Sequence, residues 1–89
     1  MKTSRVVLCN RLGLHARAAS KLVNTAAGFE SEVWLVRDGR RVNAKSIMGV
    51  LMLAAPVGTE LEIECTGADE DEALAALVAL VEDRFGEGE

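Results

Sequence analysis

The sequence predicts a single α+β domain over residues 1–89, in which helices cover one face of a four-stranded antiparallel sheet. Its size and composition are ordinary for one small globular domain: 89 residues, of which 49% are hydrophobic and 27% charged. Short runs rich in β-forming residues alternate with segments of helical periodicity. An Asp-Gly pair between two of those runs is typical of a tight hairpin. Together these patterns predict the element order β-α-β-β-α-β-α.

The first strand and the first helix are expected on either side of a short loop. Residues 3–9 read Thr-Ser-Arg-Val-Val-Leu-Cys, which favours a strand, and residues 10–14 are expected to form the loop. From His15 onward the apolar residues follow helical spacing, and Gly28 stands where a helix C′ glycine is expected. A helix is therefore predicted over residues 16–27. Its buried face would consist of Ala19, Leu22, Val23 and Ala26.

A β-hairpin is predicted in the middle of the chain. Residues 32–37 form a run rich in β-forming residues, and residues 40–43 form a second strand-like run. Asp38-Gly39 lies between them, and a type I′ turn needs a positive φ at both of its central positions, which Asp and Gly tolerate. These two strands should therefore be direct neighbours in the sheet.

The C-terminal half adds a short helix, the last strand and the last helix. Residues 47–53 favour a helix with Ser46 as its N-cap. Residues 60–65 alternate acidic and apolar side chains, as in a strand with one wet face. The acidic residues 69–72 fit the first turn of a helix, where the dipole favours negative charge. The apolar stripe of that helix would consist of Leu74, Leu77, Val78, Val81 and Phe85. Residues 86–89 are expected to be a frayed tail.

The net charge of −4 conceals a basic first half and an acidic second half. Residues 1–45 contain nine Lys and Arg against three Asp and Glu, whereas residues 46–89 contain one Arg against eleven acidic residues. The basic half would attract an acidic protein, a nucleic acid or a phosphate compound. The acidic half and the scarcity of aromatic residues argue against a nucleic-acid-binding module, which needs stacking aromatics on a basic face. No nucleic-acid partner is therefore expected.

The sequence indicates neither a metal nor a cofactor. Cys9 and Cys65 lie 56 residues apart, so no metal-ligand spacing is present, and both are expected to be small buried residues. No signal peptide is visible, and the longest apolar run, residues 47–57, is too short to span a bilayer. We therefore expect a cytoplasmic protein that does not insert into the membrane.

His15, the only histidine in the chain, is the candidate for chemistry. A lone histidine usually has no special role, but this one immediately precedes a predicted helix. The backbone N–H groups at a helix start are unpaired and would point toward an anion beside the ring. Arg17 lies on the polar face of that helix, within reach of phosphate oxygens. Because the positive end of the helix disfavours imidazolium, the ring should stay nucleophilic and able to carry a phosphoryl group.

Two segments resemble the signatures of a known family. Residues 10–17, Asn-Arg-Leu-Gly-Leu-His-Ala-Arg, and residues 45–50, Lys-Ser-Ile-Met-Gly-Val, are similar to those of the HPr family. HPr proteins are the histidine-containing phosphocarriers of the bacterial phosphoenolpyruvate-dependent sugar phosphotransferase system (PTS). The chain length, the element order and the spacing of the two segments fit as well, so the resemblance covers nearly the whole chain. It implies an open-faced β-sandwich with the helices on one side of the sheet.

The resemblance also implies roles for individual residues. His15 would take a phosphoryl group from phosphorylated enzyme I on its Nδ1 atom and pass it to IIA domains, while Arg17 would stabilise the group in transit. The family usually has a proline after Arg17, where this chain has Ala18. Alanine is a strong helix former, so the helix should survive. The departure bears on the subfamily and on how rigidly the loop before the helix is held.

The second signature indicates regulation and docking. Ser46 alone would be a helix cap, and the resemblance implies that an HPr kinase can also phosphorylate it, adding charge that repels an acidic partner. The helix over residues 47–53 is apolar on nearly all sides, so either all of its apolar residues are core or some form a docking patch. The resemblance favours docking. The patch would be Ile47, Met48 and Leu51, ringed by Arg17, Lys21 and Lys45, with Val50 and Leu53 pointing inward.

These expectations describe a phosphocarrier rather than an enzyme, since the protein is itself modified and must be recharged by another protein. The docking interface should be small and transient, because a carrier must leave after each transfer, and the chain is expected to be a monomer. The alternative is a nitrogen-related (NPr-like) carrier, which serves regulation rather than sugar uptake; the sequence does not separate the two. A hydrolase is disfavoured because no base and nucleophile pair is visible beside His15.

Overall fold

A computed structural model describes residues 1–87 of the chain and contains the predicted element order, with one additional 3₁₀ helix (η1) after the last α-helix. The strands are β1 (Lys2–Val7), β2 (Glu32–Arg37), β3 (Arg40–Asn43) and β4 (Glu60–Thr66). The helices are α1 (Ala16–Ala27), α2 (Ile47–Met52), α3 (Glu70–Glu82) and η1 (Arg84–Gly86). Within residues 1–87, none of the helices has the length and apolar character needed to cross a membrane.

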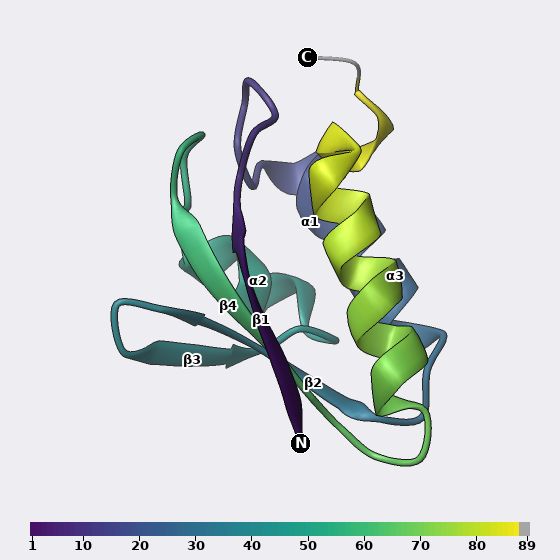
Figure 1. Cartoon of the computed structure of the whole chain (residues 1–89). Helices are drawn as coiled ribbons and strands as arrows, with labels where there is room; N and C mark the ends of the chain where they lie inside the picture. The colour runs from purple at the N-terminus through teal and green to yellow at the C-terminus, as the bar shows by residue number, and fades with distance from the viewer. Residues whose placement is uncertain (88–89) are drawn as a thin grey trace.

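The strands form one antiparallel sheet in the order β1-β4-β2-β3, and the helices cover one of its faces (Figure 1). β4 is central because it pairs with both β1 and β2, so that Glu62 lies opposite Arg5 on one side and Val36 on the other. α3 packs against β1 and β4, while α1 packs against α2 and α3. The predicted α+β class and the open-faced sandwich are therefore confirmed.

The alternation along β4 separates the two faces of the sheet. Its apolar residues, Leu61, Ile63 and Cys65, are almost fully buried. Its acidic residues, Glu60, Glu62 and Glu64, occupy the opposite face. The core between sheet and helices is built around large side chains that are fully buried: Leu8, Leu22, Leu35, Ile63, Leu77 and Phe85.

The hairpin between β2 and β3 also agrees with the prediction, since both Asp38 (φ +48°) and Gly39 (φ +81°) have the positive φ of a type I′ turn. Helix α1 has the predicted bounds, although Val23 is only partly buried and Ala18 is fully buried in its stead. Helix α2 is one residue shorter than expected, because Leu53 is its C-cap.

The two cysteines differ in their surroundings. Cys65 is buried as expected, and burial raises the pKa of its thiol, with a smaller contribution from the negative charges of Glu70 and Asp69. The expectation for Cys9 was wrong: β1 ends before it, and the side chain is exposed at the surface. Its Sγ donates a hydrogen bond to the carbonyl oxygen of Val81 (3.4 Å).

Three expectations about helix ends were wrong. Gly28 has a φ of −74° and is right-handed, so α1 ends without a left-handed glycine. Phe85 does not continue the stripe of α3, because Arg84 and Phe85 both have a φ of +54° and turn the chain into η1. Gly86 and Glu87 are not frayed, since the Glu87 N–H donates to the Arg84 carbonyl oxygen (3.0 Å). Residues 88–89 of the expected tail lie outside the described residues.

Candidate functional site

The loop between β1 and α1 holds His15 in a defined position. The Gly13 N–H donates to the Asn10 carbonyl oxygen (3.1 Å), and the Leu14 N–H donates to the carbonyl oxygen of Ala55 (2.8 Å). Gly13 has a φ of +66° and lies so close to Ala55 that a side chain would not fit. These contacts hold the backbone at His15 in one orientation at the start of α1.

His15 is the N-cap residue of α1. Its backbone is extended (φ −78°, ψ 178°), and its carbonyl oxygen accepts the Ala19 N–H (2.8 Å). The ring Nδ1 accepts the N–H of Arg17 at 3.3 Å, so the imidazole itself occupies one of the amides expected to be free for an anion. The nitrogen that faces the start of the helix is thus Nδ1.

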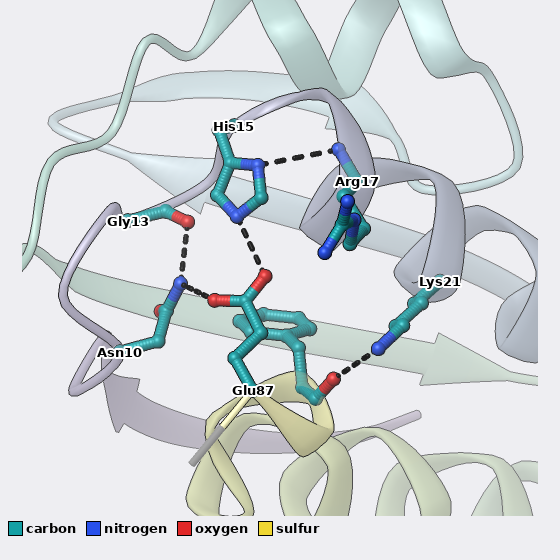
Figure 2. Close-up of polar contacts among 7 residues, drawn as sticks. Asn10, Gly13, His15, Arg17, Lys21 and Glu87 are labelled. Atoms are coloured by element: carbon teal, nitrogen blue, oxygen red, sulfur yellow. Dashed lines mark hydrogen bonds and ion pairs between the residues drawn. The ribbon is translucent and has the colours of Figure 1, made fainter. Parts of the chain in front are cut away.

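The other ring nitrogen contacts a residue that the sequence did not indicate. Nε2 of His15 lies 2.6 Å from Oε2 of Glu87, and the second oxygen of Glu87 accepts a hydrogen bond from Nδ2 of Asn10 (3.1 Å), as Figure 2 shows. Partial burial raises the pKa of Glu87, but hydrogen bonds from Asn10 and His15, together with the positive charge of Lys21, hold it below its ordinary value. The carboxylate is therefore ionised at neutral pH.

Basic side chains surround this pair. A shallow hollow of about 660 Å³ is lined by Arg11, Leu12, His15, Ala16, Arg17, Lys21, Gly86 and Glu87. Lys21 donates to the carbonyl oxygen of Phe85 (2.6 Å), which ties α1 to η1, while the Arg17 side chain is exposed. The hollow is too open for a closed enzyme pocket, but its cationic rim suits a bound anion.

Helix α2 combines a cap and an apolar surface. The Oγ of Ser46 accepts the Gly49 N–H (3.2 Å), which confirms its capping position. Val50 and Leu53 are buried, whereas Met48 is 68% exposed and Ile47 and Leu51 are each 37% exposed. Met52 is exposed as well, which the sequence did not indicate. The alternative in which every apolar residue of this helix belongs to the core was therefore wrong.

The candidate residues divide into two neighbouring groups. His15, Arg17 and Lys21 line the hollow, and α2 packs beside α1, carrying Ser46 and the exposed apolar residues. Lys45 lies between them in sequence and donates through Nζ to the carbonyl oxygen of Phe29 (2.8 Å). In the part of the chain that the structure describes, no group of His, Cys, Asp and Glu side chains is arranged to hold a metal ion.

A family model described as the PTS HPr component phosphorylation site matches residues 2–83. The chain belongs to the HPr family. It is 53% identical to the phosphocarrier protein HPr of Neisseria meningitidis serogroup B, with full coverage of both chains. It is 42% identical to the phosphocarrier protein NPr of Shewanella violacea over 93% of this chain and 91% of that protein.

The fold comparison agrees. The crystal structure of HPr-C-His from Thermoanaerobacter tengcongensis has a TM-score of 0.95 at 45% identity and covers 98% of each chain. The resemblance drawn from the two sequence signatures is thus confirmed. HPr proteins are phosphocarriers of the PTS rather than catalysts, which agrees with the class of function expected from the sequence.

Proposed function

We propose that His15 carries the phosphoryl group: its Nδ1 atom accepts the group from phosphorylated enzyme I of the PTS and passes it to IIA components. The observation that supports this most directly is the N-cap position of His15, with Nδ1 at 3.3 Å from the Arg17 N–H. A phosphoryl group on that nitrogen would lie at the positive end of α1. Its oxygens could then accept the amide hydrogen bond that the ring accepts now.

Arg17 is the proposed stabiliser of the phosphoryl group in transit. Its side chain is exposed and lines the same hollow as the ring. A guanidinium can donate two parallel hydrogen bonds to phosphate oxygens, and the negative charge on the transferred group favours such a fork. Ala18 is fully buried below this turn, so the usual family proline is replaced by a residue that packs into the core.

The exposed part of α2 is the proposed docking patch, made of Ile47, Met48 and Leu51 and flanked by Arg17, Lys21 and Lys45. Apolar side chains beside cationic ones suit a partner with an apolar patch and acidic rim. Methionine adapts to several partners, which a carrier that meets both donor and acceptors requires. The protein would act in the cytoplasm as a monomer that forms short-lived complexes.

Ser46 is the proposed regulatory site, phosphorylated by an HPr kinase where the organism has one. Its side chain is only partly buried and lies next to the docking patch. A phosphoryl group there would bring about two negative charges to a surface that favours acidic partners, so docking should weaken. Phosphorylation of Ser46 and phosphorylation of His15 are independent proposals.

The transfer assay tests the main proposal. Incubation with phosphoenolpyruvate and enzyme I should produce a phosphorylated protein whose adduct is labile in acid and stable in base, and His15→Ala should produce none. Phosphorylation that persists in the His15→Ala variant would overturn the assignment. The matched variant Arg17→Gln should still be labelled, but more slowly.

The second candidate function is a nitrogen-related carrier, and the similarity to the Shewanella violacea NPr supports keeping it. Both candidates share the chemistry at His15 and differ in the partners that they serve. Labelled protein should be offered in parallel to a sugar-class IIA domain and to a nitrogen-related IIA domain. Faster transfer to the first supports the sugar branch, and faster transfer to the second supports the regulatory branch.

A further inference from the structure

The C-terminal segment is folded so that Glu87 reaches the active-site loop. Three consecutive residues, Arg84, Phe85 and Gly86, have a positive φ (+54°, +54° and +74°). Left-handed backbone is unfavourable for a residue other than glycine, so it persists where surrounding contacts enforce it. Here Phe85 is fully buried and its carbonyl oxygen accepts Lys21 Nζ. These two contacts hold the turn in place, and the turn directs the next residue, Glu87, toward His15.

The Glu87 carboxylate is held from two sides. One oxygen is 2.6 Å from His15 Nε2, and the other accepts from Nδ2 of Asn10. Asn10 is itself fully buried, and the same Nδ2 also donates to the Gly13 carbonyl oxygen (2.7 Å). Figure 2 shows these groups as one connected chain that runs from the loop to the C-terminal segment. Because the buried Asn10 amide holds the Glu87 carboxylate in place, the carboxylate stays next to the His15 ring.

These contacts agree on one arrangement of the ring proton. An ionised carboxylate can only accept hydrogen bonds, so Nε2 must carry the hydrogen that it shares with Glu87. The Arg17 N–H can only donate, so Nδ1 must present its lone pair to it. Both contacts therefore select the tautomer with hydrogen on Nε2 and a free lone pair on Nδ1.

We infer that Glu87 is a positioning residue for phosphoryl transfer, which orients the His15 ring and keeps Nδ1 as its nucleophilic nitrogen. The inference rests on the proposed function of His15. In the transfer, the Nδ1 lone pair forms the bond to phosphorus, while the bond from phosphorus to the donor's leaving atom breaks and its electron pair leaves with the donor. Positive charge develops on the ring, and the Nε2–H shares it with the carboxylate. The onward step reverses this, returning the lone pair to Nδ1.

The test compares Glu87→Ala and Glu87→Gln with the control Glu82→Gln, which removes an exposed acid from the end of α3. Phosphoryl uptake from enzyme I should slow by about 10-fold or more in Glu87→Ala. Glu87→Gln retains an acceptor oxygen and should fall between that variant and the wild type. Glu82→Gln should match the wild type, and circular dichroism should confirm that all three variants are folded.

A spectroscopic readout separates positioning from a purely structural effect. Long-range ¹H–¹⁵N spectra of the histidine ring, recorded where the ring is neutral, should show a single Nε2–H tautomer in the wild type and a mixture in Glu87→Ala. Uptake that is unchanged or faster in Glu87→Ala would overturn the inference, and so would slower uptake with an unchanged tautomer. The ring spectrum needs no donor protein, so it tests the role of Glu87 independently of the transfer assay. A wild-type protein that enzyme I does not phosphorylate would refute the proposed function and leave the result of the ring spectrum unaffected.

Discussion

Gly13 lies directly against Ala55: a Cβ atom on Gly13 would be 2.6 Å from the Ala55 carbonyl oxygen, which already accepts the Leu14 N–H. With its φ of +66°, a side chain there would be strained as well as crowded. Gly13→Ala should therefore lower the free energy of unfolding by about 2–4 kcal/mol and slow phosphoryl uptake by displacing His15. Urea denaturation and the transfer assay measure the two effects.

The control for Gly13→Ala is Gly39→Ala in the hairpin turn. Gly39 also has a positive φ (+81°), but a Cβ there would meet no atom within 4 Å. It should cost only the conformational strain, about 1 kcal/mol, and leave transfer unchanged. Equal losses of stability in the two variants would show that the crowding at Ala55 is unimportant.

Asp69 joins the start of α3 to the segment before β2. Its carboxylate accepts the N–H groups of Glu30 and Ser31, each at 2.9 Å, as well as the Ser31 hydroxyl. The Ser31 hydroxyl, followed by the Glu30 N–H, holds the pKa of Asp69 below its ordinary value. A depressed pKa in the folded state stabilises the fold at neutral pH, and this stabilisation disappears as the pH falls through the folded-state value.

Asp69→Asn should therefore lower the free energy of unfolding at neutral pH. In this variant the free energy of unfolding should also fall less steeply than in the wild type as the pH is lowered. The measurement is the free energy of unfolding from urea titrations at a series of pH values from about 7 to about 3, which spans the ordinary titration of an aspartate. The control is Asp71→Asn, since Asp71 is exposed and contacts Lys2 only at 3.7 Å. An acid response of Asp69→Asn as steep as that of the control would contradict the prediction.

Arg37 stabilises the C-terminal end of α2. Its Nη1 atom donates hydrogen bonds to the carbonyl oxygens of Leu53 (2.6 Å) and Ala54 (3.1 Å). Carbonyl groups at the C-terminal end of a helix have no partner within the helix itself. Arg37→Met should cost about 1–2 kcal/mol in the free energy of unfolding and speed hydrogen exchange at the Leu53 amide. Arg5→Met is the comparison, because Arg5 makes a surface ion pair with Glu60 (3.4 Å) and should cost less than about 1 kcal/mol. Losses of similar size would argue that the α2 carbonyl contacts are not stabilising.

Met48 tests the docking patch. Its side chain is 68% exposed, so Met48→Gln should leave the stability of the fold unchanged. If enzyme I buries this side chain, the KM of enzyme I for the Met48→Gln variant should be about 10-fold higher than for the wild type, with little change in kcat. Val7→Gln alters an apolar side chain of similar exposure (52%) on the open face of the sheet and should leave KM as in the wild type. A KM that is unaffected in Met48→Gln would remove this residue from the proposed interface.

Local sequence patterns were sufficient to predict those elements whose structure depends on their own residues. The bounds of α1, the hairpin turn at Asp38-Gly39 and the faces of β4 all agree with local spacing and turn chemistry. The split of α2 into buried and exposed sides was one of two alternatives left open by the residues. It could not be decided locally, because the short helix is apolar nearly all round.

The features that were missed depend on contacts between distant segments. Helical spacing assigned Phe85 to the stripe of α3, but its burial against the core forces a left-handed turn that no local pattern indicates. Glu87 stands between two glycines and belongs to no periodic run, so its contact with His15 emerges only from that turn. An asparagine such as Asn10 gives no sign, within the sequence, that it will be buried beneath a glutamate 77 residues away.

The central position of β4 has a consequence for how the protein is made. β1 pairs with β4 along its length, from Lys2 opposite Cys65 to Val7 opposite Glu60. During synthesis the first strand therefore leaves the ribosome long before its neighbour exists, whereas the β2–β3 hairpin can form as soon as it emerges. Pairing over such a separation slows folding and leaves a strand edge open to other chains in the meantime. The sheet is thus completed late, and newly made molecules are most prone to misassociation before residues 60–66 arrive.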